Sequence, residues 1–171
     1  MRIIDDIKGI LANMVTDGEI KSTLYQVPSK ANERIEFVAE PCGILFCVPK
    51  GVVDISKGNI AESATIALEF VAHQPQLAFD GTLNESLVDT MRLVGYSFIN
   101  RLRALDGYSL SDTIEVRTIF DKYDANTTGV SLQFEIKDKK TKCIKYYEYN
   151  QQNQDEDTPI GTDNQPDGAS D

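Results

Sequence analysis

Histidine, serine and cysteine are the residues of this sequence that could support covalent catalysis, and their positions form no familiar catalytic pattern. His73 is the single histidine, so any Ser/His/Asp or Cys/His site would have to use it. No nucleophile flanked by glycines is present, and Ser97, in "GYSFIN", falls in the middle of an expected helix. We therefore interpret His73 as an ordinary histidine at the end of a strand.

Two loops have compositions that could hold a metal ion or a phosphate. "DKYDANTTG", residues 121–129, resembles an oxygen-rich metal loop, but it lacks the ligand spacing and the closing Glu of an EF-hand. Turn-forming Asp and Asn explain the same composition. "PKGVVDISKGN", residues 49–59, lacks the glycines and the Ser or Thr after Lys of a phosphate-binding loop. The sequence thus predicts no catalytic, cofactor or metal site, and a protein that is not an enzyme.

A basic and aromatic stretch from Lys137 to Tyr149 is the strongest candidate for a binding surface. It interleaves lysines with tyrosines, a combination that suits single-stranded nucleic acid through phosphate contacts and base stacking. A lysine-rich edge strand that guards against sheet-to-sheet association is the alternative explanation. We favour the edge strand, because acidic residues follow directly and would compete with nucleic acid. Contact with a protein partner lies between these two interpretations.

The negative charge of the chain is concentrated in its last residues. The net charge is −10 over 171 residues, and residues 151–171 hold six acids and no Lys or Arg. Residues 1–150 carry 21 acids against 17 bases, a net charge of −4, without the basic excess of nucleic-acid binders. We predict one domain over residues 1–149 and an acidic, disordered tail over residues 150–171, because the tail buries too little apolar surface to offset its ordering entropy.

Targeting signals and cysteine usage indicate a cytosolic protein. No stretch reaches the roughly 20 apolar residues that a membrane-spanning helix needs. The N-terminus has acids where a signal peptide has bases. Three cysteines agree with a reducing compartment, and Cys42 and Cys47 lack metal-ligand spacing with the histidine. We expect no membrane partner.

The first half of the chain predicts one helix and several strands. Apolar residues recur with helical spacing from Ile3 to Met14, and Gly18 ends this amphipathic helix. "EIKSTLYQV" predicts a strand; Pro28 and "SKANE" break it before "RIEFVA" alternates again. "ILFCV", residues 44–48, is continuously apolar and predicts a strand covered on both faces. "SATIALEFVAH", residues 63–73, predicts its hairpin partner across a glycine-containing loop.

The second half predicts a long helix and a hairpin. The helix carries one apolar stripe from Leu83 to Leu105, and Thr82 with Glu85 has capping-box spacing. Gly95 within it either allows close approach to a sheet or is a tolerated surface glycine. The hairpin joins residues 113–120 to an alternating strand with four inward residues (Val130, Leu132, Phe134 and Ile136). On its first strand we expect Ile114, Val116 and Phe120 to share the inward face.

Strands that cluster before and after the long helix predict an α+β domain. We expect a mainly antiparallel sheet, with the N-terminal helix and the long helix packed on one face. A parallel α/β sheet would instead alternate strands with helices along the chain.

These patterns resemble those of the tail-terminator, or tail-completion, proteins of long-tailed bacteriophages. The order of N-terminal helix, strand pair, helix and closing hairpin is similar. "ILFCVPKG…ESATIALEFVAHQP" looks like the central strand pair of that family. "TIEVRTIFDKYDANTTGVSLQFEIK" looks like its closing hairpin, with a "YD" turn and a "G-V-x-L-x-F-x-I" strand. The resemblance covers residues 1–138, whereas the acidic tail departs from the family pattern.

The resemblance implies a structural protein of the virion that forms a ring of about six copies. Such a ring caps the tail tube, ends its polymerisation and joins it to the head connector, so its partners are itself, the tail tube protein and the connector protein. It is made in the cytoplasm of the bacterial host during assembly. The loops of residues 50–62 and 121–129 are the expected contact elements, with Lys50, Asp54, Lys57, Asp121, Tyr123, Asp124 and Asn126 as candidate contact residues.

Two other classes stay open from the sequence. One is an acidic protein-interaction module of a phage or mobile element, which competes for a basic partner as an inhibitor does. It predicts a monomer or dimer whose acidic tail matters for binding. The other is a small-molecule enzyme with a deep pocket lined by carboxylates of perturbed pKa. The single histidine and the lack of glycine-rich loops argue against an enzyme.

Overall fold

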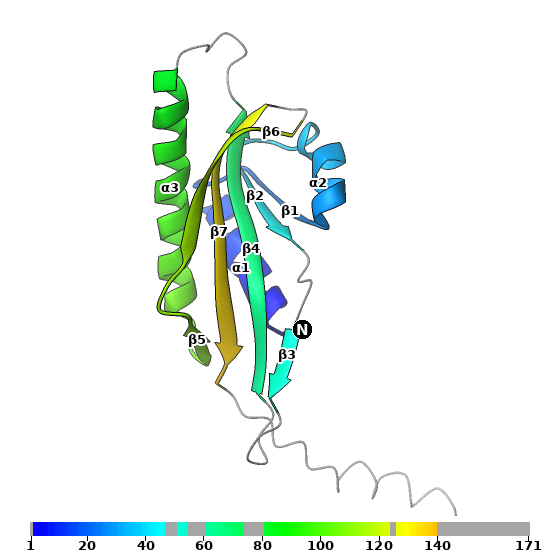
Figure 1. Ribbon diagram of the computed structural model, residues 1–171, viewed down its shortest axis with the longest axis vertical. Coiled ribbons are helices and arrows are strands. Elements are labelled where there is room, and N and C mark those ends of the chain that lie inside the picture. Colours follow the sequence, from blue (N-terminus) through cyan, green and yellow to red (C-terminus); the bar gives the residue numbers. More distant parts are fainter. Residues whose placement is uncertain (1, 47–50, 55–60, 74–80, 124–125, 140–171) are drawn as a thin grey trace, which may run out of the picture.

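The computed structural model describes residues 2–46, 51–54, 61–73, 81–123 and 126–139 (Figure 1). Within these ranges the chain forms the helices α1 (Arg2–Thr16), α2 (Pro28–Ile35) and α3 (Gly81–Arg103). The strands are β1 (Ser22–Gln26), β2 (Cys42–Phe46), β3 (Gly51–Asp54), β4 (Ala61–His73), β5 (Tyr108–Leu110), β6 (Glu115–Lys122) and β7 (Thr127–Asp138). Cys47, Cys143, residues 140–149 of the basic and aromatic stretch, and the acidic tail lie outside the described residues.

The long strands β4 and β7 form the centre of the sheet. They pair antiparallel from Ser63 with Lys137 to His73 with Thr127. Shorter strands lie beside them in tandem: β3 and β2 follow one side of β4, and β5 and β6 follow one side of β7. β1 adds to β2 in parallel. Five of the six pairings between the described strands are thus antiparallel, which confirms the predicted α+β class.

The helices α1 and α3 cover one face of the sheet, as predicted. Phe98 of α3 is fully buried, with its ring centroid 5.9 Å from that of Phe70 in β4 and 6.2 Å from that of Phe134 in β7. Gly95 faces the sheet, because a β-carbon there would lie 3.5 Å from the Leu132 side chain. This glycine is therefore buried against the sheet and is not a surface residue, although an added β-carbon would make only an ordinary contact there. The main core gathers around these contacts.

A second, smaller core lies on the opposite face, under α2. Ala31 and Ile35 of this helix pack against Ile44 and Phe46 of β2 and against Val71 of β4. The five residues of β2 are all buried, which confirms a strand covered on both faces. Figure 1 shows α2 and α3 on opposite sides of the sheet.

The helix α2 is a correction to the sequence prediction. The strand β1 ends before Pro28, as predicted, but Pro28 then begins a helix that was not predicted; proline fits the first turn because its missing N–H has no partner there. The alternation of "RIEFVA" does not make a strand, since Ile35 ends the helix and Phe37 is 81% exposed.

The hairpin of β6 and β7 is confirmed, but not every inward residue of β6. The four apolar residues of β7 are buried as predicted. In β6, Val116 is 37% and Phe120 54% exposed, whereas Ile119, of the opposite face, is buried under α2. The prediction was wrong because the helices of the main core do not extend over the outer part of β6, and a bulge follows Ile119.

Two short strands were not predicted. β3 lies within the expected loop of residues 50–62 and pairs with the start of β4. β5 has three residues and pairs with the end of β7. None of the described helices is both long enough and apolar enough to cross a membrane.

Candidate functional site

The predicted contact residues lie at opposite ends of the long strand β4. Asp54 pairs with Ala61, the first residue of β4. Tyr123 and Asn126 form the β6–β7 turn, which lies beside His73 at the other end of this strand. The 13 residues of β4 span about 40 Å at the usual rise of a strand. The two groups therefore form two separate surfaces. Of the remaining candidates, Lys50, Lys57 and Asp124 lie outside the described residues, and of Asp121 the structure describes the backbone alone.

A buried carboxylate holds the β6–β7 turn against the sheet. Glu69 of β4 is 4% exposed. Its Oε1 lies 2.5 Å from Lys122 Nζ, and its Oε2 accepts a hydrogen bond of 2.7 Å from the Tyr123 hydroxyl. Tyr123 and Asn126 both have positive φ, of 65° and 47°, which for residues other than glycine needs support from neighbouring contacts. Glu69 supplies that support on the side of Tyr123.

The charges and hydrogen bonds of Glu69, Lys122 and Tyr123 stabilise one another. Burial raises the pKa of the Tyr123 hydroxyl far above its usual value, and the hydrogen bond with Glu69 and its negative charge raise it further. The tyrosine therefore stays protonated and donates to the carboxylate at any physiological pH. Lys122 balances the charge of Glu69, as a buried carboxylate requires. Such a cluster fixes the shape of the turn.

Cys42 and His73 lie near each other on neighbouring strands, but Cys42 is not set up as a nucleophile. The thiol is fully buried, and burial raises its pKa to about 11; a hydrogen bond with Ser22 opposes this shift, and the charge of Glu40 adds to it. At neutral pH it is therefore a thiol, and the thiolate is the reactive form. His73 is exposed and ends its strand, as predicted, with Nδ1 2.7 Å from Glu40 Oε1.

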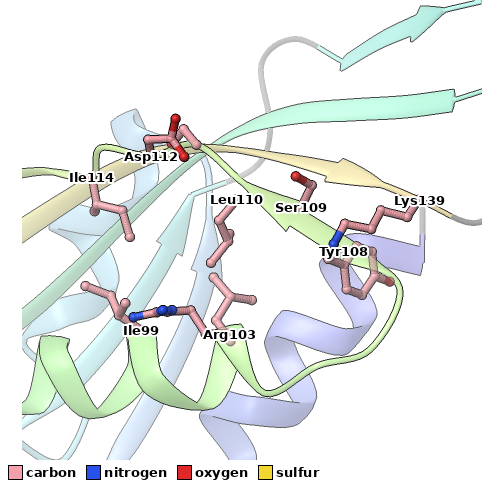
Figure 2. Close-up of a pocket in the computed structure, with 10 residues that line it drawn as sticks. Ile99, Arg103, Tyr108, Ser109, Leu110, Asp112, Ile114 and Lys139 are labelled. Carbon is pink, nitrogen blue, oxygen red and sulfur yellow. The ribbon is translucent and has the colours of Figure 1, made fainter.

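An open cleft of about 460 Å³ lies between the last turns of α3 and the strand β5 (Figure 2). Leu110 and Ile114 point toward the helix, and with Ile99 and Leu102 they form a small apolar floor, whereas the other lining residues carry polar or charged groups. Asp112 points away from the helix in the same view. The walls are fixed by backbone hydrogen bonds from Ser111 to Glu135 and from Lys139 to Gly107.

Two cations border this cleft. Arg103 and Lys139 both line it and are both exposed. Neither pairs with a carboxylate among the described residues. Apolar floor and cationic rim together suit an acidic ligand that carries an aliphatic side chain. Little in the sequence indicates this cleft, because the cleft depends on β5, whose three residues are too few for a periodic pattern.

The sheet has two different open edges among the described strands. On one side, β1 pairs with β2 alone and β3 with β4 alone; on the other side, β6 and β5 each pair with β7 alone. Each edge carries exposed apolar side chains: Tyr25 and Val27 are 40% and 44% exposed at or beside β1, and Val116 and Phe120 occupy β6. Exposed backbone groups and apolar side chains along an edge form a template for pairing with another strand.

Comparisons with known proteins add no relative to this picture. A scan against protein-family models finds no match, and a search of curated proteins finds no similar sequence.

Proposed function

We propose that the chain is a structural subunit of a long-tailed bacteriophage or prophage, which caps the tail tube and joins it to the head connector as a ring. Its place would be the virion, after assembly in the bacterial cytoplasm. The support is a fold in the order that the family resemblance implies, together with a surface suited to repeated self-association. The proposal requires neither a cofactor nor catalysis.

The pair of unlike sheet edges carries this proposal. If the β1 edge of one copy joins the β6 edge of the next, the interface is heterologous, because the two joined surfaces differ. Repetition of a heterologous interface gives a ring when the rotation closes and a filament when it does not. Tyr25 and Val27 on one edge, with Val116 and Phe120 on the other, supply apolar surface to both sides of such an interface.

The distance between the two predicted contact groups supports two different partners. Asp54 and the turn of Tyr123 and Asn126 lie at opposite ends of β4, about 40 Å apart by strand geometry. In a ring whose central strands run between its two faces, one group would meet the tail tube and the other the connector. Loops on a rigid sheet commonly carry such contacts.

The first test is the mass of the full chain in solution over a range of concentrations, alone and with polymerised tail tube. We expect rings of about six copies, formed either alone or on the tube end. Phe120→Asp should weaken assembly at least tenfold, because it places a charge in the interface. Leu93→Asp is the matched control: Leu93 is 69% exposed on α3 and should leave assembly unchanged.

Two results would count against the proposal. A monomer or closed dimer that stays so in the presence of tube would favour an acidic interaction module. Equal losses for Phe120→Asp and Leu93→Asp would show that assembly does not use the β6 edge.

A further inference from the structure

We propose that the cleft between α3 and β5 is a docking site for the chain's own acidic segment from Asp155 to Ile160. This inference is independent of the ring, since it concerns contacts within one copy. It assigns a role to the acidic residues at the end of the sequence and an occupant to a cleft that the assembly proposal does not use.

Charge complementarity is the first argument. The cleft is bordered by Arg103 and Lys139, which have no carboxylate partner among the described residues. The segment begins with three consecutive acids, Asp155, Glu156 and Asp157. Each exposed ion pair is weak by itself, so two pairs give a weak contact that salt should disrupt.

The apolar floor is the second argument. Charge alone would favour no particular part of residues 151–171, which contain no Lys or Arg. Ile160 is the one aliphatic residue larger than alanine there, apart from the prolines. It follows the three acids closely enough to enter the floor of Leu110 and Ile114 while the acids meet the cations. Contact of this side chain with the floor removes apolar surface from water and strengthens the binding.

The position of the chain is the third argument. Lys139 is the last described residue and itself lines the cleft. Residues 140–154 connect it to Asp155; fully extended they would span about 50 Å, more than a return to the cleft requires. Attachment through so short a connection gives an effective concentration on the order of millimolar. A contact too weak for two separate molecules is then sufficient.

The test follows the methyl NMR signals of Ile99, Leu110 and Ile114 in the full chain. Neutralising the three nearer acids (Asp155→Asn, Glu156→Gln, Asp157→Asn) should shift these signals, as should Ile160→Ser. The matched control neutralises three more distant acids (Asp163→Asn, Asp167→Asn, Asp171→Asn) and should leave the signals in place. Salt at 0.5 M, a concentration that screens exposed pairs, should reproduce the shifts of the first variant.

A peptide of residues 153–162 then measures affinity for the variant that lacks the nearer acids and Ile160. We expect it to restore the original methyl signals. Arg103→Glu should weaken this binding about tenfold, a change of about 1.4 kcal/mol. Lys21→Glu, a reversal at an exposed lysine far along the chain from the cleft, should not weaken it.

Three results would overturn the proposal. Unchanged methyl signals in the nearer-acid and Ile160→Ser variants would show that the segment does not occupy the cleft. Equal shifts for near and distant acids would show a general charge effect without a site. In the Phe120→Asp background, which removes the β6 side of the ring interface, signals that depend on protein concentration would show that the segment binds another copy. None of these results depends on whether rings form.

Discussion

At the scale of single residues, Glu69 decides the shape of the β6–β7 turn. The alternation of β4 assigns this glutamate to the solvent-facing side, yet it is 4% exposed because the turn folds over it. The partners of Glu69 are visible in the sequence as Lys122 and Tyr123, two adjacent residues that offer a cation and a hydroxyl donor. Their distance from Glu69 along the chain hides the connection, since only the register of β4, β7 and β6 brings them together.

Tyr123→Phe should lower the free energy of unfolding by about 1–3 kcal/mol. The substitution removes the donor to Glu69 Oε2 and leaves a buried carboxylate oxygen without that partner. Urea denaturation measures the change. Tyr96→Phe is the matched control: Tyr96 is 47% exposed, so its change should stay within about 0.5 kcal/mol. Equal effects of the two substitutions would remove the role assigned to the Glu69 contact.

The raised pKa of the buried Cys42 thiol predicts that the folded protein loses stability at alkaline pH. Burial raises its folded-state pKa to about 11 from the ordinary value of 9.0, so the folded chain keeps the thiol proton where the unfolded chain releases it. The stabilisation is complete below pH 9 and falls between pH 9 and about 11, with a slope of up to about 1.4 kcal/mol per pH unit. Unfolding free energies of the wild type and Cys42→Ala across this range isolate the contribution. Parallel curves for the two proteins would contradict it.

At the scale of elements, the predictions were correct for helices and strands whose apolar face packs against a single core along its whole length. α1, α3 and β7 each present one apolar face to a single core, so their periodicity is clear. They failed where the environment changes within an element. Val116 and Phe120 lie beyond the cover of α3, and Ile119 packs under α2 on the other face. Which face of β6 is dry depends on helices far away in the sequence.

At Gly129 the backbones of β4 and β7 lie so close together that only glycine fits. A β-carbon there would lie 2.0 Å from the Phe70 carbonyl oxygen and 2.9 Å from Val71 Cα, so β4 and β7 approach too closely for any side chain. Gly129→Ala should lower the free energy of unfolding by about 3 kcal/mol. Gly9→Ala, in α1 with nothing within 4 Å of the added carbon, should instead stabilise by about 0.5–1 kcal/mol. Thermal denaturation of both variants tests the contrast.

At the scale of the whole molecule, the difference between the β1 and β6 edges predicts how variants with one disrupted edge associate. Val27→Asp disables the β1 side, and aspartate suits this position because Val27 is the N-cap of α2. Phe120→Asp disables the β6 side. Each variant alone retains one intact edge but has no matching partner edge, so both should stay monomeric. Mixed together, they should form a one-to-one dimer and stop there, which native mass spectrometry detects. Rings in the mixture would contradict a heterologous interface.

The candidate site was partly visible in the sequence. The two contact groups could be proposed from their loop composition, but their placement at opposite ends of β4 needed the strand register. The cleft could not be predicted, because its lining comes from the end of α3, from β5 and from Lys139, each too short or too irregular to signal alone. Hydrophobic periodicity identifies helices and strands, but a site forms where the ends of several such elements lie together in the fold.

The central pairing of β4 with β7 also means that, during synthesis, β4 is made well before the strand that pairs with it. β7 ends 65 residues after β4 ends, and ribosomes add about 5–20 residues per second. The apolar strand β4 therefore waits about 3–13 seconds for its partner on that side. During this interval β4 exposes an edge that a second nascent copy could occupy. Slower synthesis or crowded expression should thus increase aggregation of newly made chains without any change in the stability of the folded protein.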